Sequence, residues 1–332
     1  MKLGVAGSGF IVTILAQTLK DLDNVCPVAM WTMPNNTEAA GKLAQNMGIA
    51  RVYTDYDEFL NDPEIDVVYV GIINSKHHEF AKRALLAGKP VILEKPFTCS
   101  YAEARELAAL ARERKLMLIE AVSFLYSPNY RLFKKAVDSL EGIKMVDCRY
   151  IQYSSRYDSY LDGKVLPAFN PQLAGGALYD INIYNLNLIV GLFGRPQSCH
   201  YHANIGFNGI DTSGVAILDY GAFKAVCIGG KDAQSTAETV ITARNGTVRL
   251  EGAANVFVSF SQNIDGQKQA FQDRKYATHM VYEFREFERI FRENDLEAVN
   301  RALDHSLEVM RIADQLRKEA GICFPCDKTE EL

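Results

Sequence analysis

Short apolar runs alternate with amphipathic segments along the first third of the chain. Runs rich in Val, Ile and Leu, typical of strands buried on both faces, are separated by segments whose apolar residues recur at helical spacing. This alternation predicts βαβ units and a parallel sheet. Strands are expected at residues 2–6, 25–31, 66–73, 91–93 and 117–120, and helices at 38–47, 55–60 and 101–115, with two more after residues 12 and 77.

The pattern changes after residue 121. Helices are expected at 128–140 and 177–192, and between them a strand at 145–153 runs into a long loop that reaches past Pro171. Strand-like runs then alternate with turns, with Asn245-Gly246 as an expected hairpin turn, which predicts a mainly antiparallel sheet. These runs lie at 200–205, 212–220, 224–228, 238–243, 247–250 and 256–261.

Two amphipathic helices, 276–294 and 296–320, are expected near the end of the chain. The two patterns together predict an α/β domain over residues 1–121, followed by an α+β domain over residues 122–332.

The composition is that of a soluble globular protein long enough for two hydrophobic cores, with 332 residues of which 48% are hydrophobic and 23% charged. A net charge of -5 argues against a nucleic-acid or anionic-membrane surface and favours small-molecule partners. No apolar run approaches the roughly 20 residues of a membrane span, and a strand pattern follows Met1 in place of a signal peptide, so a cytoplasmic protein is expected. Seven scattered cysteines indicate reduced thiols, and because the CxxC pair at 323–326 has no second pair, no metal site is expected.

A glycine-rich turn follows the first strand and opens a helix, with the sequence Gly-Ser-Gly-Phe-Ile-Val at 7–12. In a dinucleotide-binding turn the first glycine permits the tight turn, the second lets a pyrophosphate approach the backbone, and the helix N-terminus offers unpaired N–H groups to the anion. Val12 stands where a third small residue is usual, and an ordinary strand–helix turn is the alternative. Cofactor contacts are expected at Gly7, Gly9, Phe10 and Ile11.

The second strand ends without an acidic residue. Thr32-Met33-Pro34-Asn35-Asn36 follows it, where an Asp or Glu would bind the adenosine ribose of NAD, and no Arg is present for the 2′-phosphate of NADP. Thr32 and the two asparagines offer only neutral donors to a cofactor, or they cap the next helix. Because a carboxylate that would repel the phosphate is missing, NADP is weakly preferred over NAD.

Polar residues also follow the strand at 66–73, and ligands bind at the carboxyl ends of parallel strands. Asn74 and His77 are therefore candidates for cofactor contacts. A helix cap at Asn74 and a solvated first helical turn at His77 are the alternatives.

One lysine stands at the end of the next apolar strand, where Val91 to Leu93 run into Glu94-Lys95-Pro96. A charge in this place is costly unless it has a partner or a function, so Lys95 is the first candidate for catalysis. A surface lysine in a turn ended by Pro96 is the alternative.

A second candidate pair lies in the helix expected at 177–192. Asp180 and Tyr184 are four residues apart, so they emerge on one face of that helix. Taken by spacing alone, the pattern favours the alternatives, in which Tyr184 packs on the core and Asp180 is a surface charge.

The order of these motifs resembles the Gfo/Idh/MocA oxidoreductase family. The resemblance rests on GSGFIV at 7–12, NSKHHEFAKRALLAGKPVILEKP at 74–96, EAV at 120–122 and AGGALYDINIY at 174–184. It implies an N-terminal Rossmann domain and a second domain built on a large open sheet that a second subunit covers in a homodimer. It also implies NAD(P) as cofactor, with Glu94 and Lys95 among its contacts, and a sugar or polyol-like substrate.

The Asp180–Tyr184 pair resembles the family's catalytic helix in members that carry Tyr in place of His, such as glucose-fructose oxidoreductase and dimeric dihydrodiol dehydrogenase. Two positions depart from the pattern, because Leu125 and Ser127 stand where many sugar-active relatives carry Arg and His. The substrate class therefore stays open at this point.

The sequence thus predicts an NAD(P)-dependent oxidoreductase that moves hydride between nicotinamide and a carbon bearing a hydroxyl or carbonyl. Lys95 and Tyr184 are expected to contact the reacting oxygen, and Asp180 to orient Lys95 or a substrate hydroxyl. The alternative is a non-catalytic NAD(P)-binding sensor or regulatory protein of the same fold, and the presence of all three residues argues against it.

Overall fold

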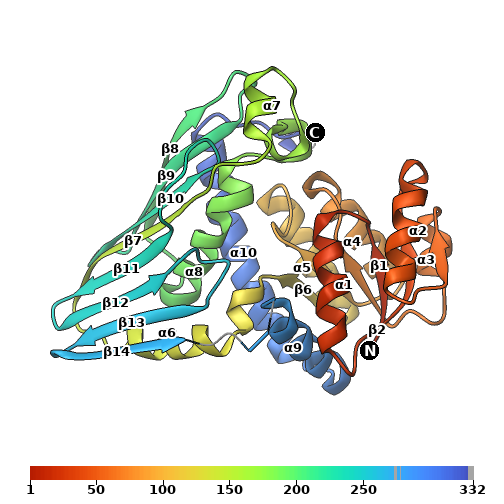
Figure 1. Ribbon diagram of the computed structural model, residues 1–332, viewed down its shortest axis with the longest axis horizontal. Coiled ribbons are helices and arrows are strands. Elements are labelled where there is room, and N and C mark those ends of the chain that lie inside the picture. The colour runs from red at the N-terminus through yellow and green to blue at the C-terminus, as the bar shows by residue number, and fades with distance from the viewer. Residues whose placement is uncertain (273–274, 277, 328–332) are drawn as a thin grey trace. The chain divides into compact units, whose positions relative to one another are not determined.

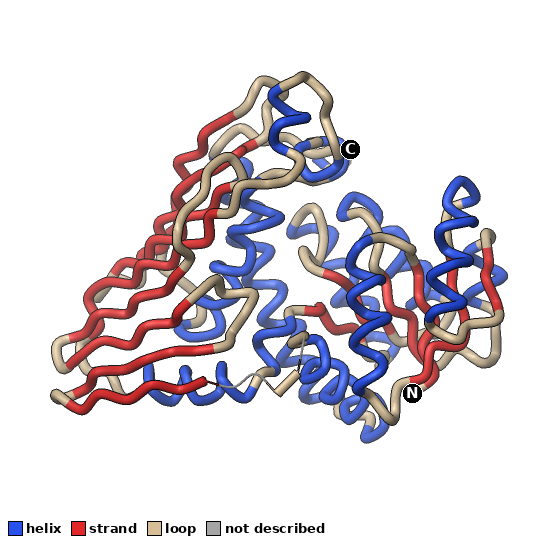
Figure 2. The backbone as a smooth tube through the Cα atoms, in the orientation of Figure 1, coloured by secondary structure: helices blue, strands red, loops and turns tan. Residues whose placement is uncertain are grey.

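The computed structural model describes residues 1–272, 275–276 and 278–327. The chain divides into two compact units, each built on one sheet (Figures 1 and 2). The first unit comprises Met1–Thr98, Ala102–Ser123 and Tyr276–Leu307, and the second comprises Cys99–Tyr101, Phe124–Lys275 and Glu308–Leu332.

The first unit is a parallel sheet of six strands in the order β3-β2-β1-β4-β5-β6. The strand order reverses between β1 and β4, which makes the carboxyl ends of these two strands the point where ligands bind in open α/β sheets. The strands are β1 Lys2–Ala6, β2 Cys26–Trp31, β3 Arg51–Tyr53, β4 Val67–Val70, β5 Val91–Glu94 and β6 Leu118–Ala121.

All residues of β4, β5 and β6 are buried, as the apolar runs predicted. The short strand β3 was not predicted, because its three residues are partly exposed and too few to show a period. The helices of this part are α1 Phe10–Thr18, α2 Thr37–Asn46, α3 Tyr56–Leu60, α4 His77–Leu86 and α5 Tyr101–Arg114.

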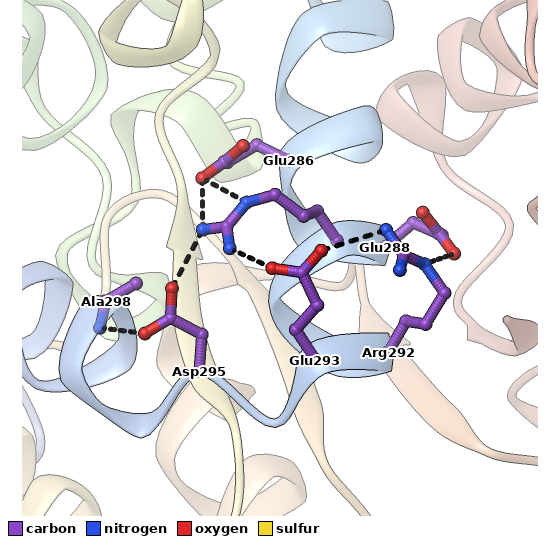
Figure 3. Close-up of polar contacts among 7 residues, drawn as sticks. Glu286, Glu288, Arg292, Glu293, Asp295 and Ala298 are labelled. Carbon is purple, nitrogen blue, oxygen red and sulfur yellow. Dashed lines mark hydrogen bonds and ion pairs between the residues drawn. The ribbon is translucent and has the colours of Figure 1, made fainter.

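Two further helices, α9 Met280–Glu293 and α10 Leu296–Glu319, follow the second sheet in the chain, and α9 with the first half of α10 belongs to the first unit. The corner between them is held by charges (Figure 3). Arg289 pairs with Glu286 at 2.7 Å and with Asp295 at 3.0 Å, and the Asp295 carboxylate accepts the Ala298 N–H at 3.0 Å, so that it caps α10.

The second unit is an open sheet of eight strands in the order β14-β13-β12-β11-β7-β10-β9-β8. Only β7 and β10 are parallel, and all other neighbours are antiparallel, so the mainly antiparallel sheet predicted from the sequence is confirmed. The strands are β7 Ile143–Ile151, β8 Ser198–Ile205, β9 Asp211–Asp219, β10 Lys224–Gly230, β11 Glu238–Ala243, β12 Gly246–Glu251, β13 Ser259–Ile264 and β14 Gln267–Gln272.

Burial alternates along the central strands of this sheet. Val146 and Cys148 on β7 are buried, as are Ala216 and Leu218 on β9, and the residues between them are half-buried. The buried face lies against α6 Pro128–Asp138 and α8 Ile183–Phe193, and among the described residues of this unit Figure 2 shows helices on that face of the sheet only. Half-buried apolar side chains therefore line the opposite face.

Two strand predictions in this sheet need correction. The run 256–261 was expected to be a strand, but β13 begins at Ser259, because Phe257 packs its ring between Phe124 and Phe133 and the Asn129 amide binds its carbonyl at 3.0 Å. Strand β14 was not predicted, since its residues are mostly polar and exposed, as is common at a sheet edge.

The long loop after β7 contains a short helix, α7 Tyr157–Leu161, and two 3₁₀ turns, Pro167–Phe169 and Pro171–Leu173. Among the described residues, no helix is long and apolar enough to cross a membrane.

Candidate active site

Gly7 makes the turn between β1 and α1 possible. Its φ of +121° lies in a region that L side chains rarely adopt, and a Cβ at this position would lie 2.3 Å from the Gly71 carbonyl oxygen. The close approach brings the ends of β1 and β4 together at the reversal of strand order. The first glycine of the motif thus serves the turn geometry that the sequence analysis assigned to it.

Gly9 leaves open space at the N-terminus of α1. A Cβ on Gly9 would meet no other part of the described chain within 4 Å, so the chain's own packing does not require a glycine here. No side chain caps this helix and its first turn carries no acidic residue. The first-turn N–H groups, among them those of Phe10 and Ile11, have no partner within the helix, which is the arrangement that binds phosphate.

A pocket of about 540 Å³ opens at this helix end. Its walls come from the carboxyl ends of β1, β2 and β4 and from the first turns of the helices that follow them. The residues are Gly7, Ser8, Gly9, Trp31, Thr32, Met33, Asn35, Asn36, Ala39, Gly71, Ile72, Ile73, Lys76, Glu79 and Phe80. Thr32 is buried, and its hydroxyl lies 3.1 Å from that of Ser8, which joins the ends of β1 and β2. The pocket has the position, polarity and size to take the adenosine half of a dinucleotide.

Lys76 is a pocket residue that the sequence analysis did not single out. It follows the end of β4, is half-exposed, and pairs with Glu79 at 2.8 Å. The signal was present in the sequence, because a lysine two residues beyond Asn74 lies at the same strand end as the predicted contacts. Asn74 itself is partly buried in the 3₁₀ turn that begins there.

His77 is fully buried beside the turn that carries Lys95. Its Nδ1 lies 2.8 Å from the Pro96 carbonyl oxygen and its Nε2 lies 3.2 Å from that of Ile72. Burial lowers the pKa of His77 to about 4, so the ring is neutral near pH 7 and donates from one nitrogen only. The shorter contact favours donation from Nδ1 to Pro96, which ties the end of β4 to the end of β5.

Lys95 is half-buried at the end of β5, among buried carboxyl groups. The Tyr69 hydroxyl donates to Glu94 Oε1 at 2.7 Å, while burial raises the pKa of Glu94 and the Lys95 charge opposes that rise. Glu120 stands at the end of the neighbouring strand, where its partner in register is Leu93.

Both carboxylate oxygens of Glu120 are buried, and neither makes a hydrogen bond of ordinary geometry with another described residue. Burial raises the pKa of Glu120 to about 7, even though the nearby Ser306 hydroxyl and Phe97 N–H lower it in part. Burial also raises the pKa of Glu283 on α9 well above its usual range, and the charge of Glu94 adds to the rise. The charge of Lys95 opposes this rise in part at Glu94 and Glu120, because it favours their ionised forms.

The predicted helix at 177–192 begins with one π-helical turn, Leu178–Asn182, and continues as α8. Two buried asparagines attach this segment to the sheet. The Asn182 amide donates to the Cys227 carbonyl of β10, and the Asn185 amide donates to the Asn182 side chain and to the Ile228 carbonyl. Gly229 completes the fit, since its Cβ would lie 2.6 Å from the Asn182 side chain. Single π-helical turns often occur at functional sites.

Of the two tyrosines in this segment, only Tyr184 is partly exposed. Tyr179 is buried and its hydroxyl donates to the Cys99 carbonyl at 3.0 Å, and burial raises the pKa of Tyr179 well above its usual range. Tyr184 is half-buried, with its ring 6.2 Å from that of Tyr150. Tyr184 is therefore the tyrosine of this segment that a substrate could reach.

Asp180 forms an ion pair that the sequence analysis missed. Its Oδ2 lies 2.6 Å from the Nζ of Lys231, whose side chain is only 2% exposed, while 39% of the Asp180 side chain remains exposed. The expectation that Asp180 orients Lys95 stays a prediction, because these two residues belong to different units. The sequence signal for Lys231 was a lysine directly after the Gly229-Gly230 end of β10.

The start of the π-helical turn is fixed by Asp211 at the beginning of β9. The Leu178 N–H and the Tyr201 hydroxyl both donate to Asp211 Oδ2, at 2.6 and 2.7 Å. Gly176 has to be a glycine, because its φ is +101° and a Cβ would lie 2.1 Å from Asp211 Oδ1. The double glycine of the motif thus serves close packing at the start of the helix.

Lys95 belongs to the first unit, and Asp180 and Tyr184 belong to the second. Their approach to a common substrate remains a prediction. Within the described parts of the chain, no group of three or more His, Cys, Asp or Glu side chains is placed to hold a metal ion.

Comparison with known proteins identifies relatives along the whole chain. Residues 1–122 match the oxidoreductase family described as having an NAD-binding Rossmann fold, GFO_IDH_MocA. The scyllo-inositol 2-dehydrogenase (NADP(+)) of Bacillus subtilis is 30% identical over 330 residues, which cover 99% of both chains. The trans-1,2-dihydrobenzene-1,2-diol dehydrogenase of Xenopus tropicalis is 27% identical over 98% of this chain and 99% of that protein.

A solved structure has the same fold. The 3-ketoreductase of Actinomadura kijaniata, in complex with TDP-benzene and NADP, superposes with a TM-score of 0.81 over 96% of this chain and 97% of its own, at 21% identity. The two sheets and the similarity over the full length of the chain point to the same family. The chain is thus a member of the Gfo/Idh/MocA family, an NAD(P)-dependent oxidoreductase that acts on hydroxyl or carbonyl groups.

Proposed function

We propose that the protein is an NADP(H)-preferring dehydrogenase or reductase of an inositol, a sugar, a related polyol or a dihydrodiol, in which Tyr184 carries the proton. The observation that carries the proposal is the partial exposure of Tyr184 on a helix whose asparagines and second tyrosine are buried. The substrate classes are those named for relatives that match nearly the whole chain.

In this mechanism a bound nicotinamide supplies or accepts the hydride. Tyr184 gives the proton to the reacting oxygen in reduction and takes it in oxidation, and Lys95 binds the same oxygen. A tyrosine has an ordinary pKa of ~10, so a nearby ammonium has to favour its phenolate before it can exchange protons near neutral pH. Asp180 orients a substrate hydroxyl or Lys95.

The cofactor contacts follow from the pocket. The uncapped N-terminus of α1, with Gly7, Gly9, Phe10 and Ile11, suits the pyrophosphate. Thr32 and Asn74 stand at strand ends beside the adenosine half, and Lys76 adds a cation that favours the 2′-phosphate of NADP. We assign Glu94 and Lys95 to the nicotinamide side, with His77 acting there through the Pro96 turn that its ring holds.

Domain roles, location and assembly are parts of the same proposal. Residues 1–121 form the cofactor domain and residues 122–332 the substrate-binding and dimerisation domain, although residues 276–307 pack with the first unit. The protein is cytoplasmic, in keeping with cysteines that form no disulfide among the described residues. It is a homodimer through the uncovered face of the second sheet.

Replacement of Tyr184 by Phe tests the proton carrier. Tyr184→Phe removes the hydroxyl and keeps the ring, so turnover should fall by roughly 100-fold or more while cofactor affinity barely changes. A substrate is first found by screening inositols, sugars, polyols and dihydrodiols against NADPH and NADH at the reduced-nicotinamide absorbance. Tyr220→Phe is the matched control, because it removes a hydroxyl that binds the Gly194 carbonyl in the same unit, and it should keep its turnover.

Lys95→Met should lower turnover by a similar factor. The double variant should be little slower than the slower of the two single variants, since Lys95 and Tyr184 act together. Near-normal turnover in Tyr184→Phe would defeat the assignment of the proton carrier. Tight dinucleotide binding without turnover on any substrate would instead favour the non-catalytic sensor.

A further inference from the structure

Lys231 is a buried lysine at the edge of the predicted catalytic segment. It directly follows β10, and its side chain is 2% exposed, which is rare for a lysine unless it has a partner. Its backbone is held on both sides, since its N–H donates to the Thr212 carbonyl at 2.8 Å and its carbonyl accepts the Ser154 N–H at 2.9 Å. The ammonium group is thus in a fixed place.

The Lys231 ammonium contacts a carboxylate, a backbone carbonyl and an aromatic ring. Its Nζ lies 2.6 Å from Asp180 Oδ2 and 2.6 Å from the Ala168 carbonyl oxygen, and it stands 4.5 Å from the centre of the Phe169 ring. Lys231 thus joins the segment that carries Asp180 to the loop that carries Ala168 and Phe169.

The glycines before Lys231 bring it within reach of Asp180. The Cβ of a larger residue at Gly229 would collide with Asn182 of the π-helical turn, and a Cβ at Gly230 would lie 3.2 Å from Ile151 and Ser213. The strand end can approach the helical turn closely because Gly229 lacks a side chain, and Gly230 fits between Ile151 of β7 and Ser213 of β9. The site thus combines one buried cation, one partly exposed carboxylate and the loop residues Ala168 and Phe169.

We propose that Lys231 is a positioning residue of the reaction, which rests on the proposed function. It fixes one carboxylate oxygen of Asp180 and ties the loop at 166–170 to the helix that carries Tyr184. Asp180 then presents its exposed part in a constant direction toward the hydroxyl of a polyol-type substrate. Removal of Lys231 releases both the Asp180 carboxylate and the loop. The reaction then slows because these parts are no longer held in position, although every group that touches the substrate is still present.

Substitution of Lys231 by Met removes the ammonium and keeps most of the side-chain length. With a substrate from the screen, Lys231→Met should lower kcat by roughly 10-fold to 100-fold, because small displacements of positioning groups have effects of this size. The NADPH dissociation constant should stay unchanged, since the cofactor pocket is lined by residues of the first unit. Lys231→Arg keeps the positive charge and should recover a large part of kcat.

A cycle with Asp180→Asn separates positioning from mere stabilisation. If Lys231 acts mainly through Asp180, the loss of kcat in the double variant should be well below the product of the two single losses. Its melting temperature should exceed that of Lys231→Met, because no unpaired carboxylate remains beside the buried site. Losses of kcat that multiply in the double variant would overturn the proposal, as would a Lys231→Met protein that melts earlier but turns over normally when folded.

Lys224→Met is the matched control. Lys224 lies at the opposite end of β10 and pairs with Asp219 at 2.8 Å, but its side chain is 43% exposed. The same substitution there should change neither kcat nor the melting temperature appreciably. An equal loss of kcat in this variant would show that any charge change on the strand disturbs the enzyme, and the proposal would fall.

Crystal structures of the wild type and Lys231→Met give a readout that does not depend on turnover. The Asp180 carboxylate and residues 166–170 should occupy different positions in the variant. An Asp180 that keeps its place without Lys231 overturns the positioning role, even if no substrate is found. Loss of activity in Tyr184→Phe but not in Lys231→Met leaves the proposed function standing while this inference fails.

Discussion

At the scale of single residues, Glu120 and Lys231 are two buried charges with opposite surroundings. Lys231 has a carboxylate, a carbonyl and a ring against its ammonium, whereas neither buried oxygen of Glu120 makes a hydrogen bond of ordinary geometry with another described residue. Burial of a carboxyl group favours its protonated form. Glu120 therefore changes its charge near neutral pH, at a strand end next to the one that carries Lys95.

Replacement of Glu120 by Gln should change how stability depends on pH. The pKa of Glu120 is about 7 in the folded protein and 4.5 in the unfolded chain, so the folded state binds more protons between these values. The free energy of unfolding of the wild type therefore falls as the pH rises through this window. Glu120→Gln removes that contribution, and the variant should match the wild type near about pH 5 and exceed it near about pH 8, by up to about 3 kcal/mol.

Urea unfolding at a series of pH values measures this difference. Glu106→Gln serves as the control, because the Lys82 ammonium holds the pKa of the exposed Glu106 below its usual range and its removal should act in the opposite direction. Parallel curves for the wild type and Glu120→Gln would show that Glu120 does not titrate in this window.

The sequence was informative about single residues where a strand or helix pattern gave them a place. Lys95 was found because it ends an apolar strand, and Asp180 and Tyr184 because they lie four apart. Lys231 also ends a strand, but the predicted strand stopped at Ile228, so the lysine fell among turn residues. Burial of its ammonium depends on Asp180 and Ala168, which are distant in the sequence and meet it only in the fold.

At the scale of elements, the strands of the first sheet other than β3 were predictable because they are mostly apolar, and most of the helices because they follow at regular intervals. The π-helical turn was not predictable, since it arises from contacts of Asn182 with β10 and of Leu178 with Asp211. The spacing of apolar residues predicts an α-helix but does not show where a π-helical turn interrupts it. The ends of a helix are thus less predictable where a group that is distant in the sequence fixes them.

We expect the ends of β2 and β4 to set the preference between NADPH and NADH. No acid stands at the end of β2, and Lys76 lines the same pocket, so NADPH should bind at least as tightly as NADH. Lys76→Met should weaken NADPH binding roughly fivefold and leave NADH unchanged, as expected for one exposed charge pair. Met33→Asp should shift preference toward NADH by repelling the 2′-phosphate.

Titration by nicotinamide fluorescence measures all of these affinities. Lys82→Met is the matched control, because Lys82 lies on α4, the helix that follows Lys76, but pairs with Glu106 and does not line the pocket. A wild type that clearly prefers NADH, or an equal loss for both cofactors in Lys76→Met, would contradict the role given to this strand end.

At the scale of the whole molecule, the second sheet has one face without cover among the described residues. Val226 pairs in register with Ile217, and Ile228 with Val215, so four half-buried apolar side chains form one patch on β9 and β10. Arg149 on the adjacent β7 pairs with Asp147 and lies 4.0 Å from Glu238 at the side of this patch. An apolar centre with charged residues at its border is the usual composition of a subunit interface.

The protein should therefore be a dimer through this face. Stable interfaces bury roughly 800 Å² on each partner, an area that a sheet face of several strands can provide. Ile217→Glu places a charge at the centre of the patch and should give a folded monomer by light scattering, because an unpaired carboxylate would be buried in each half of a two-fold interface. Val52→Glu, on the short strand β3 of the other unit, adds the same charge at an apolar residue that is already 38% exposed and should leave the dimer intact. A wild type that is monomeric at micromolar concentration refutes the proposed interface, and dimers that persist in Ile217→Glu place the interface elsewhere on the chain.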